Sequence, residues 1–206
     1  MIVLDIGACV GIFTDYCIEK YGIDKIEKIY AFEPFKANYD FLVEKYTDND
    51  KVQIFNYAIS DFVGEARLYK KPKKNTMPFV WDYVGAAGSS LNKRKVNVWA
   101  NSFDIVKVEK ISSFFIRNSI MSKEELNKIK LIKIDVEGAE YKILEDIIDS
   151  GMYKSLSQIY FEDHCHKVSG LKKERDRVLQ MIEDLDIKHM FYIQAPSHPL
   201  DYIPLP

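Results

Sequence analysis

Short apolar runs alternate with helix-like stretches along almost the whole chain. The run Ile2 to Ile6 is followed by a helical stretch at 12–21, and the same order repeats further on. Later apolar runs lie at 29–32, 52–59, 66–69, 131–136, 159–161 and 190–193, and later helical stretches at 35–46, 112–118, 122–129, 139–150 and 172–185. This alternation predicts a mainly parallel sheet with helices on both faces. Since ligands of such sheets bind beyond the carboxyl ends of the strands, residues that directly follow each run are the first candidates for function.

The first such position is a glycine-containing loop that joins the first strand to the first helix. Its pattern is D-x-G-x-x-x-G, from Asp5 through Gly7 to Gly11. A glycine at the turn brings backbone N–H groups close to a ligand, and the helix N-terminus favours a carboxylate. Asp5 is positioned to accept hydrogen bonds from an ammonium group. The dinucleotide-binding pattern G-x-G-x-x-G is absent because Cys9 replaces its middle glycine, so a smaller and less anionic cofactor is indicated.

Two further strand ends supply groups that suit a nucleoside. Glu33 and Pro34 end the second strand, 22 residues after Gly11. An acidic residue at about this spacing holds ribose hydroxyls in doubly wound folds. Ala58 and Asp61 follow the third strand, where we expect backbone groups and the Asp61 side chain to flank a purine ring.

The fourth and fifth positions concentrate acids and histidine. Asp135 and Glu137 follow one apolar run, and Glu162 and His164 follow the next. These side chains are predicted to meet at the carboxyl edge, where Asp135, Glu162 and His164 are the candidate catalytic residues. Glu140 is interpreted as an acid of the first helical turn, favoured by the helix dipole.

Four sequence blocks resemble the FkbM family of methyltransferases. They read VLDIGACVGIFT, YAFEPFKANYDFL, NYAISDFVGEARLY and LIKIDVEGAEYKILEDI, in the family's order, over roughly residues 2–150. The resemblance implies the class I methyltransferase fold, with a seven-stranded sheet whose last strand is antiparallel. It also implies S-adenosyl-L-methionine as cofactor and a hydroxyl group of a sugar or natural product as acceptor. The expected cofactor contacts are Asp5, Gly7, Ala8, Cys9, Gly11, Phe13, Thr14, Glu33, Pro34, Ala58, Asp61 and Asp135. Cys9 departs from the asparagine common in the family.

The expected reaction is in-line transfer of the sulfonium methyl to a substrate oxygen, with His164 or Asp135 as general base. In a second version, Asp135 and Glu162 ligate Mg²⁺ or Mn²⁺, which lowers the pKa of a coordinated hydroxyl. The segment 72–101 is predicted to be a long loop or a loose hairpin, whose Trp81, Tyr83 and Trp99 either stack on sugar rings or pack internally. An RNA ribose is an alternative acceptor. A non-catalytic binding module is an alternative of another class, and a dehydrogenase is disfavoured by the missing glycine.

Composition narrows these options. The chain has 206 residues and a net charge of -2, which suits one domain and speaks against a nucleic-acid partner in spite of local lysine clusters. Three cysteines without a C-x-x-C pattern indicate reduced thiols, and no long apolar run or signal sequence is visible, so a cytoplasmic location is expected. Because an apolar strand starts directly after Met1, we expect the methyltransferase domain (1–206) either to come from a larger polypeptide with further domains or to lack the helix that usually precedes the first strand.

Overall fold

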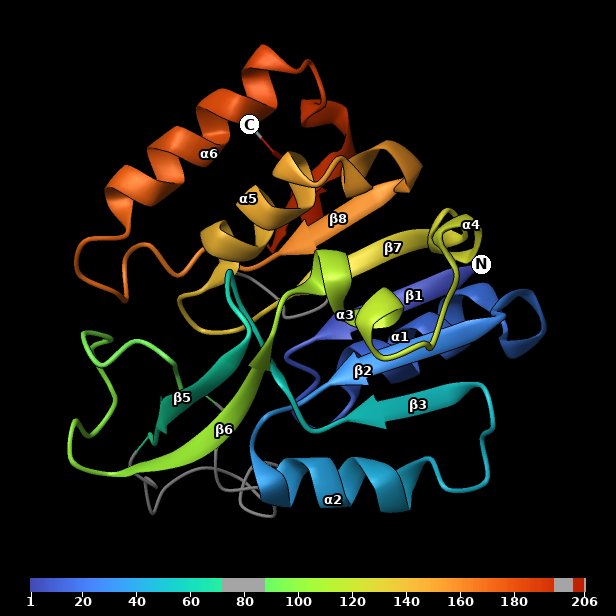
Figure 1. Ribbon diagram of the computed structural model, residues 1–206, viewed down its shortest axis with the longest axis horizontal. Coiled ribbons are helices and arrows are strands. Elements are labelled where there is room, and N and C mark those ends of the chain that lie inside the picture. The colour runs from blue at the N-terminus through green and yellow to red at the C-terminus, as the bar shows by residue number, and fades with distance from the viewer. Residues whose placement is uncertain (72–87, 195–201, 206) are drawn as a thin grey trace.

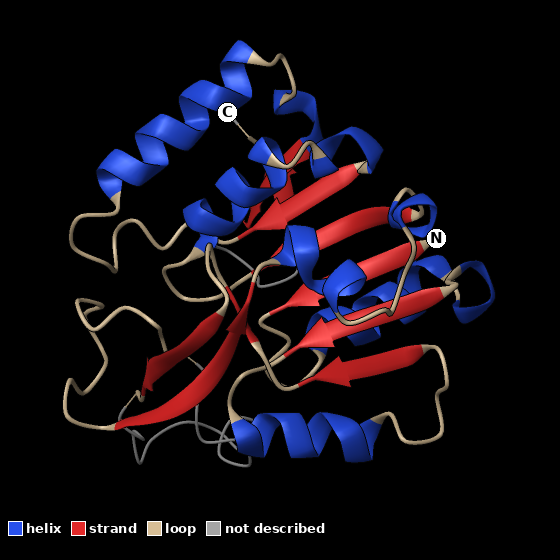
Figure 2. Ribbon diagram, viewed as in Figure 1, coloured by secondary structure: helices blue, strands red, loops and turns tan. Residues whose placement is uncertain are grey.

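The computed structural model describes residues 1–71, 88–194 and 202–205. It contains a large central sheet covered by helices and a small second sheet beyond one edge of it (Figures 1 and 2). Trp81 and Tyr83 of the predicted loop lie outside the described residues. The described part of that loop, 88–101, forms no regular strand or helix.

The central sheet has seven strands in the order β10-β9-β8-β7-β1-β2-β3. Its strands are β1 (Ile2–Ile6), β2 (Lys28–Phe32), β3 (Val52–Phe55), β7 (Ile129–Ile134), β8 (Gln158–Phe161), β9 (Phe191–Gln194) and β10 (Tyr202–Pro204). All neighbours pair in parallel except β10, which runs antiparallel to β9 at the edge. The predicted fold class is therefore confirmed.

Helices cover both faces of this sheet (Figure 1). They are α1 (Ile12–Tyr21), α2 (Lys36–Lys45), α3 (Ile111–Arg117), α4 (Lys123–Leu126), α5 (Glu140–Asp149) and α6 (Lys172–Asp184), with short 3-10 turns η1 (Ile23–Lys25), η2 (Met152–Ser155) and η3 (Lys188–Met190). Apolar side chains of α3, α5 and α6 form the main core with one sheet face. Side chains of α1 and α2, such as Phe13 and Leu42, pack on the other face.

Local sequence explains several helix boundaries. Gly11 precedes α1 in the left-handed conformation, and Gly22 ends it, as predicted. Ser122 and Glu125 form the predicted capping box of α4, in which each side chain accepts a hydrogen bond from the other residue's backbone N–H.

The second sheet was predicted only in part. It contains β4 (Ala58–Ile59), β5 (Gly64–Tyr69) and β6 (Phe103–Glu109) in the order β4-β6-β5. The prediction of a single strand at 52–59 was wrong, because the chain leaves the central sheet after Phe55. Asn56 lies at this break, where its side-chain amide donates to the carbonyls of Glu33 and Pro34 at 2.9 and 3.0 Å. The break redirects the chain into the small sheet, beyond the carboxyl ends of the central strands (Figure 1).

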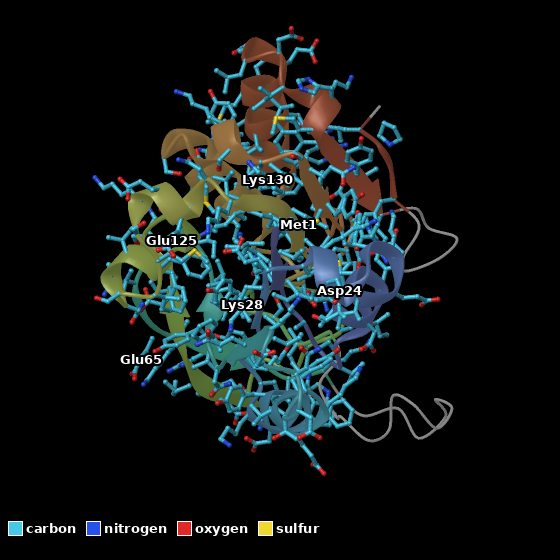
Figure 3. The ribbon with its side chains drawn as sticks, turned by 90° about the vertical axis from the view of Figure 1, so that its right-hand side faces the viewer. Met1, Asp24, Lys28, Glu65, Glu125 and Lys130 are labelled. Carbon is cyan, nitrogen blue, oxygen red and sulfur yellow. The ribbon has the colours of Figure 1, made fainter. Side chains whose placement is uncertain are left out.

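Figure 3 views the side of the central sheet where the strands begin, where Met1, Lys28 and Lys130 lie. The candidate residues follow strands that end at the opposite edge. Among the described residues, no helix is both long and apolar enough to cross a bilayer.

Candidate functional site

The loop after β1 is fixed between two neighbouring strand ends. The N–H groups of Gly7 and Ala8 both donate to the carbonyl of Phe32, at 2.9 and 3.0 Å, at the end of β2. On the other side, a Cβ built on Gly7 would lie 1.8 Å from the carbonyl oxygen of Asp135. Gly7 has φ 80°, so both conformation and space require glycine. The loop and the end of β7 are therefore packed backbone to backbone.

The polar residues beneath this loop support it from inside. Asp5 is fully buried, accepts a hydrogen bond from the Thr14 hydroxyl at 2.8 Å, and lies 3.4 Å from the Lys133 ammonium. Lys133 also donates to the carbonyl of Gly7 at 2.7 Å. Phe13 packs edge-on against Tyr160 in the core. The structure thus gives Asp5, Phe13 and Thr14 supporting positions under the loop.

Glu33 holds the loop from the side of β2. Its Oε2 accepts from the Cys9 N–H at 2.8 Å, and its Oε1 accepts from the Phe35 N–H at 2.9 Å. The side chain is buried, and this burial raises the pKa of Glu33 to about 7 although both hydrogen bonds oppose the shift. Cys9 itself has φ 51°, a conformation that asparagine adopts more readily than cysteine. The structure therefore places Glu33 directly against the glycine loop.

The other predicted cofactor contacts have different environments. The N–H of Gly11 donates to the Ala8 carbonyl at 2.7 Å and closes the turn. Pro34 is half-buried and Ala58 is buried. Asp61 is exposed and forms an ion pair with Lys142 of α5 at 3.2 Å. Asp61 is thus tied to α5.

Asp135 and Glu162 end the adjacent parallel strands β7 and β8 and remain partly open to solvent. Their side chains are 31% and 27% exposed. Burial raises the pKa of Asp135 to about 6, and the neighbouring carboxylates add to this effect while Lys133 opposes it. Contacts with His164 and Lys167 lower the pKa of Glu162 to about 2 against the opposing effect of burial. The expected meeting of these acids at the carboxyl edge is observed, since their oxygens and a His164 nitrogen lie within 4.8 Å of one another.

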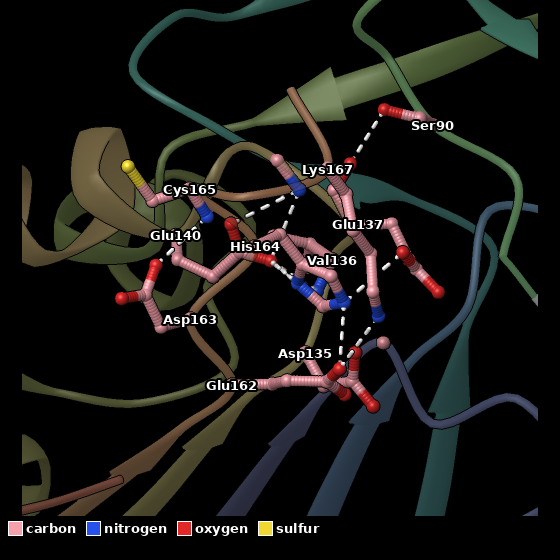
Figure 4. A network of polar contacts seen from close by, with 12 residues as sticks. Ser90, Asp135, Val136, Glu137, Glu140, Glu162, Asp163, His164, Cys165 and Lys167 are labelled. Carbon is pink, nitrogen blue, oxygen red and sulfur yellow. Dashed lines mark hydrogen bonds and ion pairs between the residues drawn. The ribbon is translucent and has the colours of Figure 1, made fainter. Parts of the chain in front are cut away.

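His164 is the centre of a polar cluster (Figure 4). It is fully buried, with Nδ1 2.7 Å from Glu140 Oε1 and Nε2 2.9 Å from Glu162 Oε1 and 3.0 Å from Glu137 Oε2. Burial opposes protonation, yet the carboxylates raise the pKa of His164 to about 12. A buried imidazole in this setting has no open face from which to take a substrate proton. The structure therefore does not favour His164 as the general base.

Glu137 connects this cluster to the described end of the long loop. It adopts φ 60°, and its carboxylate lies 2.7 Å from the buried Lys95 ammonium. Its carbonyl accepts a hydrogen bond from the Ser90 hydroxyl at 2.6 Å. Although burial and these partners act in opposite directions, His164 and Lys95 hold the pKa of Glu137 well below its ordinary value.

Sequence reasoning missed three polar partners of the site. Lys133 carried a signal, because it stands two positions before Asp135 in a buried strand and so points to the same face. The sequence held no such signal for Lys95 and Ser90. They belong to an irregular segment about forty residues before Glu137, and only the folded chain places them at the site.

Comparisons with known proteins bear on the fold and the family of the chain. A curated relative, the AMB antimetabolite synthetase AmbE of Pseudomonas aeruginosa, is 22% identical over 93% of this chain, which covers 10% of that protein. A crystal structure of the methyltransferase FkbM from Methylobacillus flagellatus shares the fold, with a TM-score of 0.51 and 16% identity over 87% of this chain and 36% of that one. The chain thus spans a small part of each. The model of the family described as "Methyltransferase FkbM domain" matches residues 5–188, and the chain therefore belongs to the FkbM methyltransferase family.

Proposed function

We propose that this chain transfers the methyl group of S-adenosyl-L-methionine to a hydroxyl oxygen. The observation that carries the proposal is the arrangement at the ends of β1, β2 and β7. There the glycine loop is packed against Asp135 on one side and hydrogen-bonded to Glu33 on the other. A nucleoside bound by Glu33 and an amino-acid moiety bound along the loop would direct the reactive group toward the acids after β7 and β8.

The residues fit this cofactor. Glu33 has one partner N–H on each oxygen, and each carboxylate oxygen has a second lone pair for a ribose hydroxyl. Bidentate acceptance by an ionised carboxylate gives short, strong hydrogen bonds. The cofactor supplies a methyl group on a positively charged sulfur. The partly exposed carboxylate of Asp135, next to the loop, is the group that would favour this cation.

Asp135 is the proposed general base. It is the acid next to the glycine loop, and its side chain is partly exposed, so a substrate hydroxyl can reach it. Lys133 lies 3.5 Å away and orients the carboxylate. Glu162, held by Lys167 at 3.0 Å, lies close to Asp135, is also partly exposed, and is proposed to position the acceptor.

The first proposed acceptor is a sugar hydroxyl. Trp99 is 59% exposed, and it belongs to the segment that Ser90 and Lys95 anchor at Glu137. An exposed indole suits the apolar face of a sugar ring. A hydroxyl on a natural-product intermediate is the second candidate, because the relative named above is an antimetabolite synthetase. RNA ribose ranks below both, given the net charge of -2.

The cofactor is tested by titrating the protein with S-adenosylhomocysteine in a calorimeter. Wild type is expected to bind, and Glu33→Ala is expected to bind about 10- to 100-fold more weakly because two charge-assisted hydrogen bonds are lost. Glu27→Ala is the matched control, since Glu27 is an exposed glutamate paired with Lys128 at the opposite edge. A folded wild-type protein that does not bind the ligand would refute the proposal.

The reaction is tested with methyl-labelled cofactor and a panel of sugars, hydroxylated amino acids and RNA. Asp135→Asn should bind S-adenosylhomocysteine and lose turnover, and Trp99→Ala should raise KM for sugars without changing cofactor affinity. Unchanged turnover in Asp135→Asn removes it as base. Cofactor binding without transfer to any acceptor would support a binding module in place of an enzyme.

A further inference from the structure

One nitrogen of the cluster around His164 has an unusual environment. Nε2 lies 2.9 Å from Glu162 Oε1 and 3.0 Å from Glu137 Oε2, yet among the described residues it has no partner with hydrogen-bond geometry. The side chain is fully buried. A buried polar atom that lacks a hydrogen bond is costly, and a bound ion is one physical reason for its presence. Glu162 lies beside this nitrogen as a second ligand of a common ion would, whereas Glu137 is paired with the Lys95 ammonium at 2.7 Å.

The other nitrogen is fixed as a hydrogen-bond donor. Nδ1 lies 2.7 Å from Glu140 Oε1, and Glu140 is itself fully buried. The N–H of Gly138 donates to both oxygens of Glu140 at 3.0 Å, so this carboxylate cannot easily turn away. Because this carboxylate holds the proton of Nδ1, the proton on Nε2 is the one that a metal ion would displace, and a histidine whose other nitrogen donates to a carboxylate is the usual arrangement of a metal-binding histidine.

We propose that Asp135, Glu162 and His164 Nε2 bind one divalent transition-metal ion, for which Mn²⁺ fits the donors best. Their ligand atoms lie within 4.8 Å of one another. With ligands about 2.1 Å from an ion, neighbouring ligand atoms are about 3 Å apart and opposite ones about 4.2 Å, so a small side-chain contraction closes the site. Mg²⁺ prefers oxygen ligands alone, whereas one imidazole with two carboxylates suits Mn²⁺. The ion takes the place that a proton occupies on Nε2 in the metal-free protein.

The burial of the ligands explains how such an ion would serve the proposed methyl transfer. His164 is buried behind the site, while the carboxylates of Asp135 and Glu162 are partly exposed. An ion held in this way keeps open positions toward the acceptor, and coordination lowers the pKa of a hydroxyl there. The second oxygen of Asp135 would be left to accept the proton of such a hydroxyl. This catalytic role rests on the proposed function, whereas binding of the ion does not.

The site is tested on the full chain after removal of metals by chelation. Mn²⁺ is titrated in while its free electron-paramagnetic-resonance signal is recorded. We expect one ion bound per chain, and at least about tenfold weaker binding for Glu162→Gln. Glu145→Gln is the matched control and should bind Mn²⁺ as wild type does. Glu145 lies on α5, where it pairs with Arg177 of α6. Equal affinity of Glu162→Gln and wild type would overturn the proposal.

A second measurement covers the case in which the variant does not fold. Mn²⁺ added to wild type should broaden the NMR resonances of the His164 imidazole and leave those of His189, on η3, sharp. Titration with S-adenosylhomocysteine on the same sample separates the two proposals. If S-adenosylhomocysteine binds but Mn²⁺ does not bind up to about 1 mM, the metal site is refuted and the proposed function is not. If Mn²⁺ binds but S-adenosylhomocysteine does not, the metal site is supported and the proposed methyl transfer is contradicted.

Discussion

Lowering the pH is a sharp perturbation of the proposed cofactor site because it acts on Glu33. This carboxylate is 6% exposed, and burial raises its pKa to about 7 against the two backbone hydrogen bonds from Cys9 and Phe35. Only the ionised form can accept hydrogen bonds from a ribose with both oxygens. The affinity for S-adenosylhomocysteine should therefore follow the ionised fraction of Glu33.

The expected size of the effect follows from that pKa. About nine-tenths of Glu33 is ionised at pH 8 and about one-tenth at pH 6, and the apparent Kd is the intrinsic Kd divided by the competent fraction. The affinity should fall about tenfold between pH 8 and pH 6, with little change above pH 8. Calorimetry at pH 6, 7 and 8 measures this slope directly.

Glu33→Gln provides the comparison. It should bind weakly at every pH and show no such slope, because the titrating group is gone. A wild-type affinity that is independent of pH over this range would refute the reasoning, as would an equal slope in Glu33→Gln. Either outcome would mean that Glu33 is not the carboxylate whose ionisation controls binding.

The raised pKa of Glu33 also makes the stability of the fold depend on pH. Glu33 titrates at about 4.5 in an unfolded chain and at about 7 in the folded protein. The stability it contributes is therefore present below pH 4.5 and lost as the pH rises through 7. The rise corresponds to about 3 kcal/mol. Without cofactor, wild type should lose about this much stability between pH 4.5 and 8, whereas Glu33→Gln should not. The difference in free energy of unfolding between the variant and wild type, measured by denaturant titration, should therefore rise by about 3 kcal/mol over this range.

Three further predictions concern the frame of the site. Gly7→Ala should prevent stable folding or cofactor binding, since its Cβ would meet the Asp135 carbonyl, whereas Gly151→Ala, also left-handed but only in ordinary contact with the Lys154 side chain, should cost roughly 1–2 kcal/mol in thermal unfolding. Lys133→Met should destabilise by about 3 kcal/mol because it leaves Asp5 buried without its cation, and the exposed Lys128→Met should change little. Tyr46→Phe should cost about 1 kcal/mol while S-adenosylhomocysteine affinity is kept, because the variant loses the hydroxyl that lies 2.7 Å from the Asp15 carboxylate and 3.0 Å from the Gly11 carbonyl.

The sequence predicted the central sheet well for a physical reason. Parallel strands buried on both faces appear as uninterrupted apolar runs, and the rule that ligands bind beyond their carboxyl ends placed Asp135 and Glu162 near one another before any geometry was known. The small sheet was harder to predict. The apolar run at 66–69 lies within β5 (Gly64–Tyr69), but periodicity does not show that this strand pairs with β6 in a separate sheet.

The environment of each site residue could not be predicted in the same way. His164 follows β8 by only a few residues, and nothing in its neighbours Asp163 and Cys165 indicates that it is fully buried. Its surroundings depend on Glu140 from α5 and on Glu137 from the turn before it. Periodicity identifies which strand a residue follows, but the packing of loops determines whether an imidazole there is a base, an ion-pair partner or a ligand.

The frame beneath the site has a consequence for how its two halves act together. Lys133 contacts the Gly7 carbonyl and lies within 3.5 Å of both Asp5 and Asp135, so one buried cation joins the cofactor loop to the acidic edge. The close packing of Gly7 on the Asp135 backbone couples the same two parts. Asp135 is therefore held in place by the loop that is proposed to bind the cofactor. A displacement of that loop would move the proposed base, and through it one ligand of the proposed ion, so cofactor position and acceptor activation depend on the same few backbone atoms.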